Sequence, residues 1–133
     1  MITVWLLPLL VLGTVPIQQP SQCYALTYDS LSEHARPEDF PATVRLGRGT
    51  TTYRHLSAAQ DLGGRWGTPL DWNTYRLRGD SIVVWLADGN REIKIAGRVV
   101  GEALDASIAL YFDEAGIRLM AHLTGRLTSC GVQ

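Results

Sequence analysis

The chain has 133 residues, of which 12 are lysine or arginine and 13 are aspartate or glutamate, giving a formal net charge of -1. This balance argues against non-specific nucleic-acid binding, which depends on a clustered excess of positive charge. Hydrophobic residues make up 46% of the sequence, and its length suits one globular domain with a modest core.

The N-terminal segment is apolar and uncharged. Residues 1–17 carry no acidic or basic side chain, and residues 4–12 (VWLLPLLVL) have the length and composition of a signal-peptide hydrophobic region. Pro8 and Gly13 leave the segment short of the ~20 apolar residues that span a bilayer as a helix. We therefore predict a signal peptide over residues 1–22 and no stable transmembrane span after processing. The rest, residues 23–133, is predicted to be a single β domain in a secreted or periplasmic location.

Cys23 and Cys130 are the only two cysteines, and they bracket almost all of the predicted mature domain. In an exported protein this placement predicts a disulfide that joins the two ends of the domain. Two alternatives stay open. Cleavage after Ala25 would remove Cys23 and leave Cys130 as an odd thiol in an oxidising compartment. A lipid anchor on Cys23 would also prevent the disulfide.

The first half of the mature chain has little regular pattern. Pro37, Pro41 and Pro69, together with several glycines, divide it into short segments. Only residues 42–46 and 50–56 have the pattern of strands. Residues 57–62 are predicted to form a single helical turn, which Gly63-Gly64 ends.

The C-terminal half consists of short apolar or alternating runs that are separated by turn-forming residues. Ile108, Leu110 and Phe112, for example, alternate with Ser107 and Tyr111, which predicts a strand with one face packed on the core and the other facing solvent or lining a cavity. Such strands joined by tight hairpins indicate an antiparallel meander. The predicted strands are 73–77, 81–87, 91–95, 99–104, 107–112 and 117–128, with turns at 79–80, 88–90, Gly97, Asp105 and 113–116.

A sheet of about eight antiparallel strands has to close or form a sandwich to remove its edges, and sequential hairpins favour closure. We therefore expect an all-β domain in which an antiparallel meander closes into a small up-and-down β-barrel. A β-sandwich is the alternative. A disulfide that joins the first strand to the last one fits the closed form.

A family resemblance supports the barrel. Residues 79–85 (GDSIVVW), 93–101 (IKIAGRVVG) and 126–130 (RLTSC) resemble small secreted bacterial proteins of lipocalin-like type. The resemblance covers roughly the C-terminal half. The Gly-x-Trp of classical lipocalins is missing near the mature N-terminus, and residues 64–66 (GRW) are its nearest match. The resemblance implies a barrel and an apolar ligand, and it transfers no binding residue.

No set of residues points to catalysis, a cofactor or a metal. His34, His55 and His122 form neither a His-x-His nor a His-Glu-x-x-His spacing. The chain contains no Gly-x-Ser-x-Gly elbow. Residues 47–50 (GRGT) lack the Gly-Lys-Ser/Thr continuation of a phosphate loop. We therefore expect a protein that is not an enzyme and uses no cofactor.

Aromatic residues supply the candidate ligand pocket. Trp85 lies in residues 82–86, which are apolar at every position and indicate a strand covered on both faces, with Trp85 toward the core or a lumen. A lumen lined by Trp72, Trp85, Tyr111 and His122, with Arg76 as a further polar tip, would suit a small molecule. The opposite interpretation, that the rings fill the core, is favoured because eight-stranded barrels leave little space.

Two functions remain at this stage. The first is an exported cell-envelope β-barrel domain that binds a small apolar or amphipathic ligand without catalysis. The second is a structural or protein-interaction module of the envelope, with a filled core and no ligand. The oligomeric state is left open.

Overall fold

The chain forms an all-β domain with one short helical turn. The structure, a computed structural model, describes residues 20–112 and 116–131, so the predicted signal peptide lies almost entirely outside the described residues. No described helix is long and apolar enough to cross a membrane. The elements in chain order are β1 (Gln22–Asp29), η2 (Pro37–Asp39), β2 (Thr43–Leu46), β3 (His55–Gln60), β4 (Thr74–Arg78), β5 (Ser81–Asp88), β6 (Arg91–Val100), β7 (Ala103–Phe112) and β8 (Ile117–Thr128).

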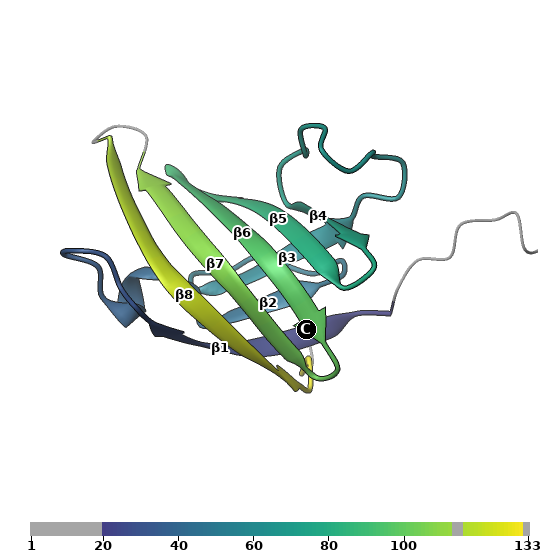
Figure 1. The fold of residues 1–133 in the computed structure, drawn as a ribbon, viewed down its shortest axis with the longest axis horizontal. Helices are drawn as coiled ribbons and strands as arrows, with labels where there is room; N and C mark the ends of the chain where they lie inside the picture. Colours follow the sequence, from purple (N-terminus) through teal and green to yellow (C-terminus); the bar gives the residue numbers. More distant parts are fainter. Residues whose placement is uncertain (1–19, 113–115, 132–133) are drawn as a thin grey trace, which may run out of the picture.

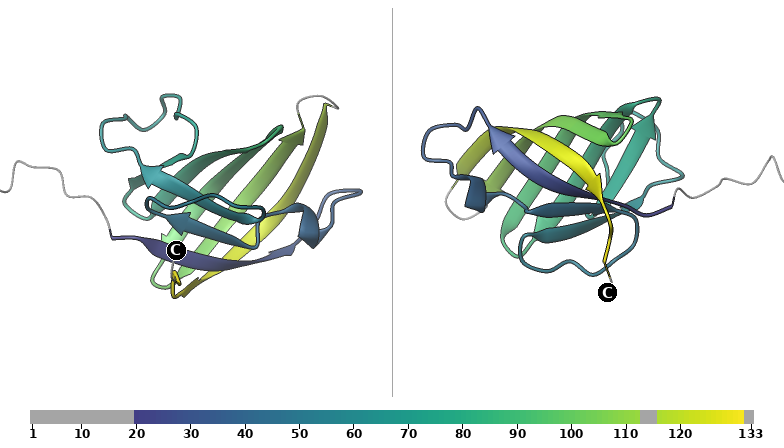
Figure 2. Two further views of the ribbon diagram at one scale, coloured as in Figure 1. Left: turned by 180° about the vertical axis from the view of Figure 1, so that it is seen from behind. Right: turned by 90° about the horizontal axis from the view of Figure 1, so that it is seen from below.

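The eight strands close into a barrel in chain order (Figure 1). β1 completes the closure by pairing antiparallel with β8, from Cys23 opposite Thr128 to Asp29 opposite His122. The right-hand view of Figure 2 shows these two strands, purple and yellow, side by side. The predicted closed barrel is confirmed, and the β-sandwich alternative is not adopted.

The strand pairing is mixed. β4 to β8 form antiparallel pairs, as does β1 with both of its neighbours. In contrast, β2 pairs parallel with β3, and β3 pairs parallel with β4. A parallel pair requires a connection that returns the chain to the same end of the sheet, and loops 47–54 and 61–73 provide it. The barrel therefore differs from a purely antiparallel meander at these two seams.

Apolar side chains fill the barrel interior. In β5, Ile82, Val84 and Leu86 are at most 2% exposed, and their partners Ile93 and Ile95 in β6 are equally buried. An eight-stranded barrel has just enough interior space for such side chains. Mostly aliphatic side chains therefore fill the barrel interior. The interpretation that the rings of the predicted pocket fill the core was wrong, because Trp72 is 52% exposed and neither Trp72 nor Trp85 is among the buried core residues. The other buried core residues are Tyr24, Phe40, Val44, Leu46, Leu56, Ala58, Tyr75, Leu104, Ala106, Ile108, Leu110, Leu119, Ala121 and Leu123.

The first half contains more regular structure than its sequence indicated. β1 was not predicted as a strand, although Tyr24 points inward and Leu26 and Tyr28 pack against the core. β3 replaces both the predicted strand 50–56 and the predicted helical turn 57–62, which were wrong. The alternation in β3 is masked because Ser57, on the outer face, is itself only 5% exposed.

The predicted turns at Gly97 and Asp105 were also wrong, because both residues lie inside strands. A Cβ at Gly97 would lie 2.2 Å from the carbonyl oxygen of Asp105 and 2.4 Å from Cα of Ala106. Gly97 therefore allows a close approach of two backbones, which is the second meaning of a glycine within a strand pattern. The chain reverses instead at residues 101–102. The predicted turn around Gly89 is confirmed, and Gly89 adopts a φ of 62°.

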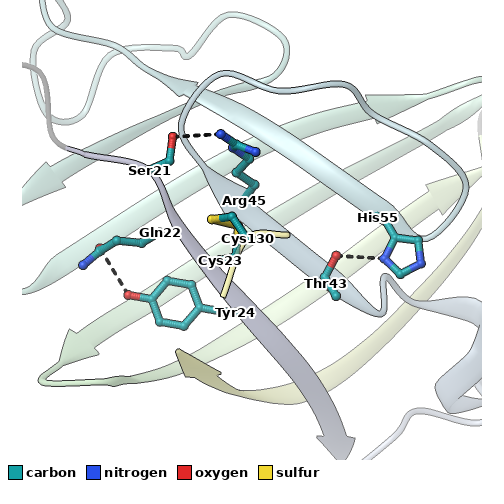
Figure 3. Close-up of a disulfide and its surroundings, with 8 residues drawn as sticks. All are labelled: Ser21, Gln22, Cys23, Tyr24, Thr43, Arg45, His55 and Cys130. Atoms are coloured by element: carbon teal, nitrogen blue, oxygen red, sulfur yellow. Dashed lines mark hydrogen bonds between the residues drawn. A yellow bond between two sulfur atoms is a disulfide. The ribbon is translucent and has the colours of Figure 1, made fainter. Parts of the chain in front are cut away.

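The predicted disulfide between Cys23 and Cys130 is present, with the two Cα atoms 5.1 Å apart. Cys23 lies in β1, and Cys130 follows the end of β8 (Figure 3). The bond therefore fastens the seam at which the barrel closes. A disulfide at this position is compatible with an oxidising compartment, such as the periplasm or the extracellular space.

Candidate functional site

A long loop between β3 and β4 stands over the outer face of the barrel. It comprises residues 61–73 and is the teal segment that rises from the barrel wall beside β4 and β5 in Figure 1. Arg76 of β4 lies beneath it. The Arg76 side chain is on the outer face, because its neighbour Tyr75 points into the core, yet Arg76 is only 6% exposed. The loop therefore covers a charged group, which has to find its partners within the protein.

The guanidinium group of Arg76 holds the loop at several points. Nε donates to Oδ2 of Asp61 at 2.9 Å, and Nη2 donates to the carbonyl oxygen of Pro69 at 2.9 Å. Nη1 donates to the carbonyl oxygens of Arg65 and Thr68 and to Oγ1 of Thr68. Charge-assisted hydrogen bonds of this kind are about twice as strong as neutral ones. Arg76 thus fixes the start and the middle of the loop to the barrel.

A groove of about 410 Å³ lies between the fixed loop and the sheet. The loop contributes Trp66 and Leu70, and the outer faces of β5 and β6 contribute Val83, Trp85 and Lys94. Small-molecule pockets in proteins typically have volumes of ~300–1,000 Å³ and mostly apolar walls with a few polar groups. The groove meets both conditions.

Two tryptophan rings are in tilted contact beside the groove, Trp85 in its lining and Trp72 next to it. The ring centroids of Trp72 and Trp85 are 4.2 Å apart, with an interplanar angle of 43°. Nε1 of Trp85 donates a hydrogen bond to Oε1 of Glu92 at 2.9 Å, which fixes the orientation of the indole ring. Trp72 remains 52% exposed. The pair therefore presents a large aromatic surface to solvent.

Basic side chains lie against these aromatic rings. Nζ of Lys94 is 5.4 Å from the ring centroid of Trp85 and 5.7 Å from that of Tyr111. The guanidinium carbon of Arg118 lies 5.9 Å from the ring centroid of Tyr111. Lys94 also pairs with Glu92 at 3.5 Å. These distances are typical of cation–π contacts, and they give the aromatic surface a positively charged border.

The structure brings together part of the predicted pocket. Trp72 and Trp85 are in contact, and Tyr111 is joined to them through Lys94. The predicted position of Trp85 toward the core or a lumen was wrong. Trp85 pairs with Lys94 on the outer face, whereas Val84 and Leu86 on either side are buried in the core. The strand is covered on both faces, as expected, but loop 61–73 covers the outer one.

His122 lies apart from the groove. Its Nδ1 is 2.8 Å from Oδ1 of Asp29 in β1, and its Nε2 is 2.5 Å from Oδ1 of Asp105 in β7. The hydrogen bond to Asp105, and then that to Asp29, raises the pKa of His122 above its ordinary value of 6.5. The imidazole therefore links three neighbouring strands at the closing seam, and it is not part of the aromatic cluster.

Two of the residues that build the groove were missing from the predicted pocket. Trp66 lies in a loop with no strand pattern, and Lys94 has the alternation of an ordinary solvent-facing position. Arg76 was expected as a polar tip of a cavity, and it proves to be the anchor of loop 61–73. The only signal available in the sequence was that Arg76 directly follows the inward-facing Tyr75 in an alternating strand.

Within residues 20–112 and 116–131, no three His, Cys, Asp or Glu side chains come together in a way that could hold a metal ion. Comparison of the chain with known protein families, curated proteins and solved structures finds no match. The functional argument therefore rests on the geometry of the groove.

Proposed function

We propose that this protein is an exported β-barrel domain that binds a small amphipathic molecule in the groove between loop 61–73 and strands β5 and β6. The observation that carries the proposal is the attachment of the loop by Arg76, through Asp61 at its start and Pro69 further along it. A wall that is fixed in advance lowers the entropy that a ligand loses on binding. The groove is thus pre-formed, as small-molecule sites usually are.

The lining residues indicate the chemistry of the ligand. Trp66 and Trp85 offer flat apolar surfaces for a ring or a hydrocarbon chain. Nζ of Lys94, whose side chain is 55% exposed, can meet a polar or anionic group at the edge of the groove. An apolar body with one charged or polar group suits this arrangement. The ligand lies on the outer wall of the barrel in this proposal, because the interior is filled.

Two observations support export. The Cys23–Cys130 disulfide is compatible with an oxidising compartment, and the predicted signal peptide precedes the first strand directly. The resemblance to lipocalin-like proteins is kept as a proposal about the barrel architecture. It does not extend to a ligand inside the barrel.

A second candidate function is a protein-interaction module of the cell envelope. The observation in its favour is Trp72, a large apolar side chain that is 52% exposed and that contacts Trp85, over which Lys94 lies. Tryptophan and arginine are enriched at the centres of protein interfaces. The two functions differ in whether a small molecule alone saturates the groove.

Titration of the full chain with anilinonaphthalene sulfonate and with laurate, followed by tryptophan emission, tests the proposal. Saturable binding is expected. Trp66→Ala and Lys94→Gln should each weaken it about tenfold, or ~1.4 kcal/mol. Tyr53→Ala is the matched control, because Tyr53 is 71% exposed and lies outside the groove lining. No saturable response to either probe would overturn the proposal and leave the interaction module. So would equal weakening by all three substitutions.

A further inference from the structure

A second hollow lies over the outer face of β2 and β3, away from the groove over β5 and β6. It has a volume of about 250 Å³ and is separate from the aromatic groove. Loop 47–54 covers it on one side, with Thr50 and Thr52 in the lining, and the Cys23–Cys130 disulfide closes the other side. Figure 3 shows the disulfide end of this region, where Arg45 lies beside Ser21 and close to the two sulfur atoms.

The strand register places polar side chains in adjacent rows on this face. Arg45 of β2 pairs with Ser57 of β3, and Thr43 pairs with His55. Thr43 Oγ1 and His55 Nδ1 are 2.9 Å apart and bond to each other (Figure 3). Among the described residues that line the hollow, the groups are one guanidinium, one imidazole and several hydroxyls, and none is a carboxylate. The lining is therefore rich in hydrogen-bond donors and carries positive charge.

Two polar atoms in this lining have no hydrogen-bond partner among the described residues. Nε of Arg45 and Oγ of Ser57 are both buried, and neither forms a hydrogen bond with any described residue. Ser57 is only 5% exposed. The one hydrogen bond of the Arg45 guanidinium that reaches another side chain is a long one, from Nη2 to Oγ of Ser21 at 3.4 Å. Buried polar groups in folded proteins are nearly always hydrogen-bonded, so two orphans on paired residues indicate a group that is bound there.

We propose that this hollow, which we call the Arg45 pocket, binds an oxyanion: a carboxylate, sulfate or phosphate group. Guanidinium groups recognise such anions through parallel hydrogen bonds, and hydroxyls donate to the remaining oxygens. An acceptor-rich anion would supply partners for Arg45 Nε and Ser57 Oγ after small rotations of both side chains. The partly buried guanidinium group of Arg45 also has no acidic side chain in the lining as a counter-charge, which an anion would supply.

The position of the disulfide connects the pocket to the closing seam of the barrel. Cys23 is directly opposite Arg45 in the β1–β2 pair, and Cys130 brings Ser129 to the lining. The disulfide therefore holds one wall of the Arg45 pocket in place. The pocket is independent of loop 61–73, so its ligand can be tested separately from the ligand of the groove.

The test is a titration of the full, disulfide-bonded chain with sodium sulfate, sodium phosphate and sodium acetate at constant ionic strength, with sodium chloride as the reference salt. Binding is followed by backbone amide NMR shifts and by melting temperature. Saturable shifts are expected at Arg45, Ser57 and Ser129. A response to sulfate and phosphate alone identifies an inorganic or ester oxyanion, and a response to acetate alone identifies a carboxylate.

Three substitutions make the test decisive. Arg45→Met should weaken binding at least tenfold, whereas Arg126→Met, which removes the same charge from an exposed position on β8, should leave it within twofold. Ser57→Ala should weaken binding severalfold without lowering the melting temperature in chloride, because it removes an unpaired hydroxyl. It also tests the proposal if Arg45→Met fails to fold. The absence of saturable shifts for all three anions would overturn the proposal, as would equal binding by wild type and Ser57→Ala.

Discussion

Two regions of the barrel are built in different ways. From β4 to β7 the strands are joined by two-residue turns at 79–80, 89–90 and 101–102, and each strand pairs antiparallel with the next. From β1 to β4 the connections are long, and two of the three strand pairs are parallel. The β3–β4 pair has only two registered residues on each strand, against ten on each strand for β7–β8.

We call β4 to β8 the hairpin region, and β1 to β3 with loops 47–54 and 61–73 the long-loop region. The hairpin region gives a regular wall whose inner face fills the core. The long-loop region places loop 61–73 over the groove and loop 47–54 over the Arg45 pocket. In both candidate sites, a long loop and the outer faces of neighbouring strands together supply the lining residues.

The largest expected effect comes from breaking the disulfide, which joins the two regions at the β1–β8 seam. For a separation of 107 residues, the chain-entropy model gives about 4 to 5 kcal/mol. Cys23→Ser should therefore lower the melting temperature by at least about 10 °C. Hydrogen exchange should show that β1 and β2 lose protection before β6 and β7 do.

The double substitution Cys23→Ser/Cys130→Ser is the control for a stray thiol, and it should match the single variant. A melting temperature within a few degrees of wild type in both variants would show that the seam holds without the bond. In that case the long-loop region is more stable than we infer.

Arg76→Met tests whether the long-loop region depends on one buried cation. Removing one partner from a fully buried ion pair costs about 3–5 kcal/mol, and we expect about 2–3 kcal/mol because Asp61 can rehydrate. The Asp61 side chain is already 23% exposed. Loop 61–73 should become sensitive to limited proteolysis, and binding in the groove should be lost. Arg98→Met, which breaks an exposed ion pair with Asp80, is the control and should change the unfolding free energy much less, because solvent screens exposed pairs.

A pair of glycine substitutions compares the two regions directly. Gly89 occupies a two-residue turn with φ of 62°, and Gly63 lies in loop 61–73 without a positive φ; a Cβ at either position meets nothing within 4 Å. Gly89→Ala should lower the unfolding free energy by about 1–2 kcal/mol, through left-handed backbone strain alone. Gly63→Ala should change it by less than about 0.5 kcal/mol. Similar effects in chemical denaturation at both sites would show that the turn at 89–90 can relax.

The two regions also differed in how far the sequence predicted them. In the hairpin region, a continuous apolar run located β5, and alternation in the other strands together with turn residues located the turn at Gly89 and the closed barrel. The error at Gly97 arose because a glycine marks either a turn or a close backbone approach, and only the partner strand decides which one applies. In the long-loop region, parallel pairing depends on how long loops return along the barrel, and no local pattern records that path.

The candidate site was predicted in part for the same reason. Trp72, Trp85 and Tyr111 attracted attention as large rings, and the structure places them in one neighbourhood. The face of the barrel on which Trp85 lies was not predictable from residues 82–86. Because both faces of this strand are covered, the run is apolar at every position and lacks the alternation that would show which way Trp85 points. The role of Arg76 depends on loop carbonyl oxygens, which every residue carries and no sequence pattern distinguishes.

The smallest expected effect concerns His122, which connects β1 of the long-loop region to β7 and β8 of the hairpin region. Its two aspartate partners, Asp29 and Asp105, raise its pKa in the folded state. The stabilisation is therefore fully present below about pH 6.5, the unfolded-state value, and is lost as the pH rises through the higher folded-state pKa. The melting temperature of wild type should exceed that of His122→Gln at low pH, and the difference should shrink with rising pH. A difference between wild type and His122→Gln that stays constant or grows with pH would show that the imidazole acts only by packing, and that the charge on His122 contributes nothing to the joint between the two regions.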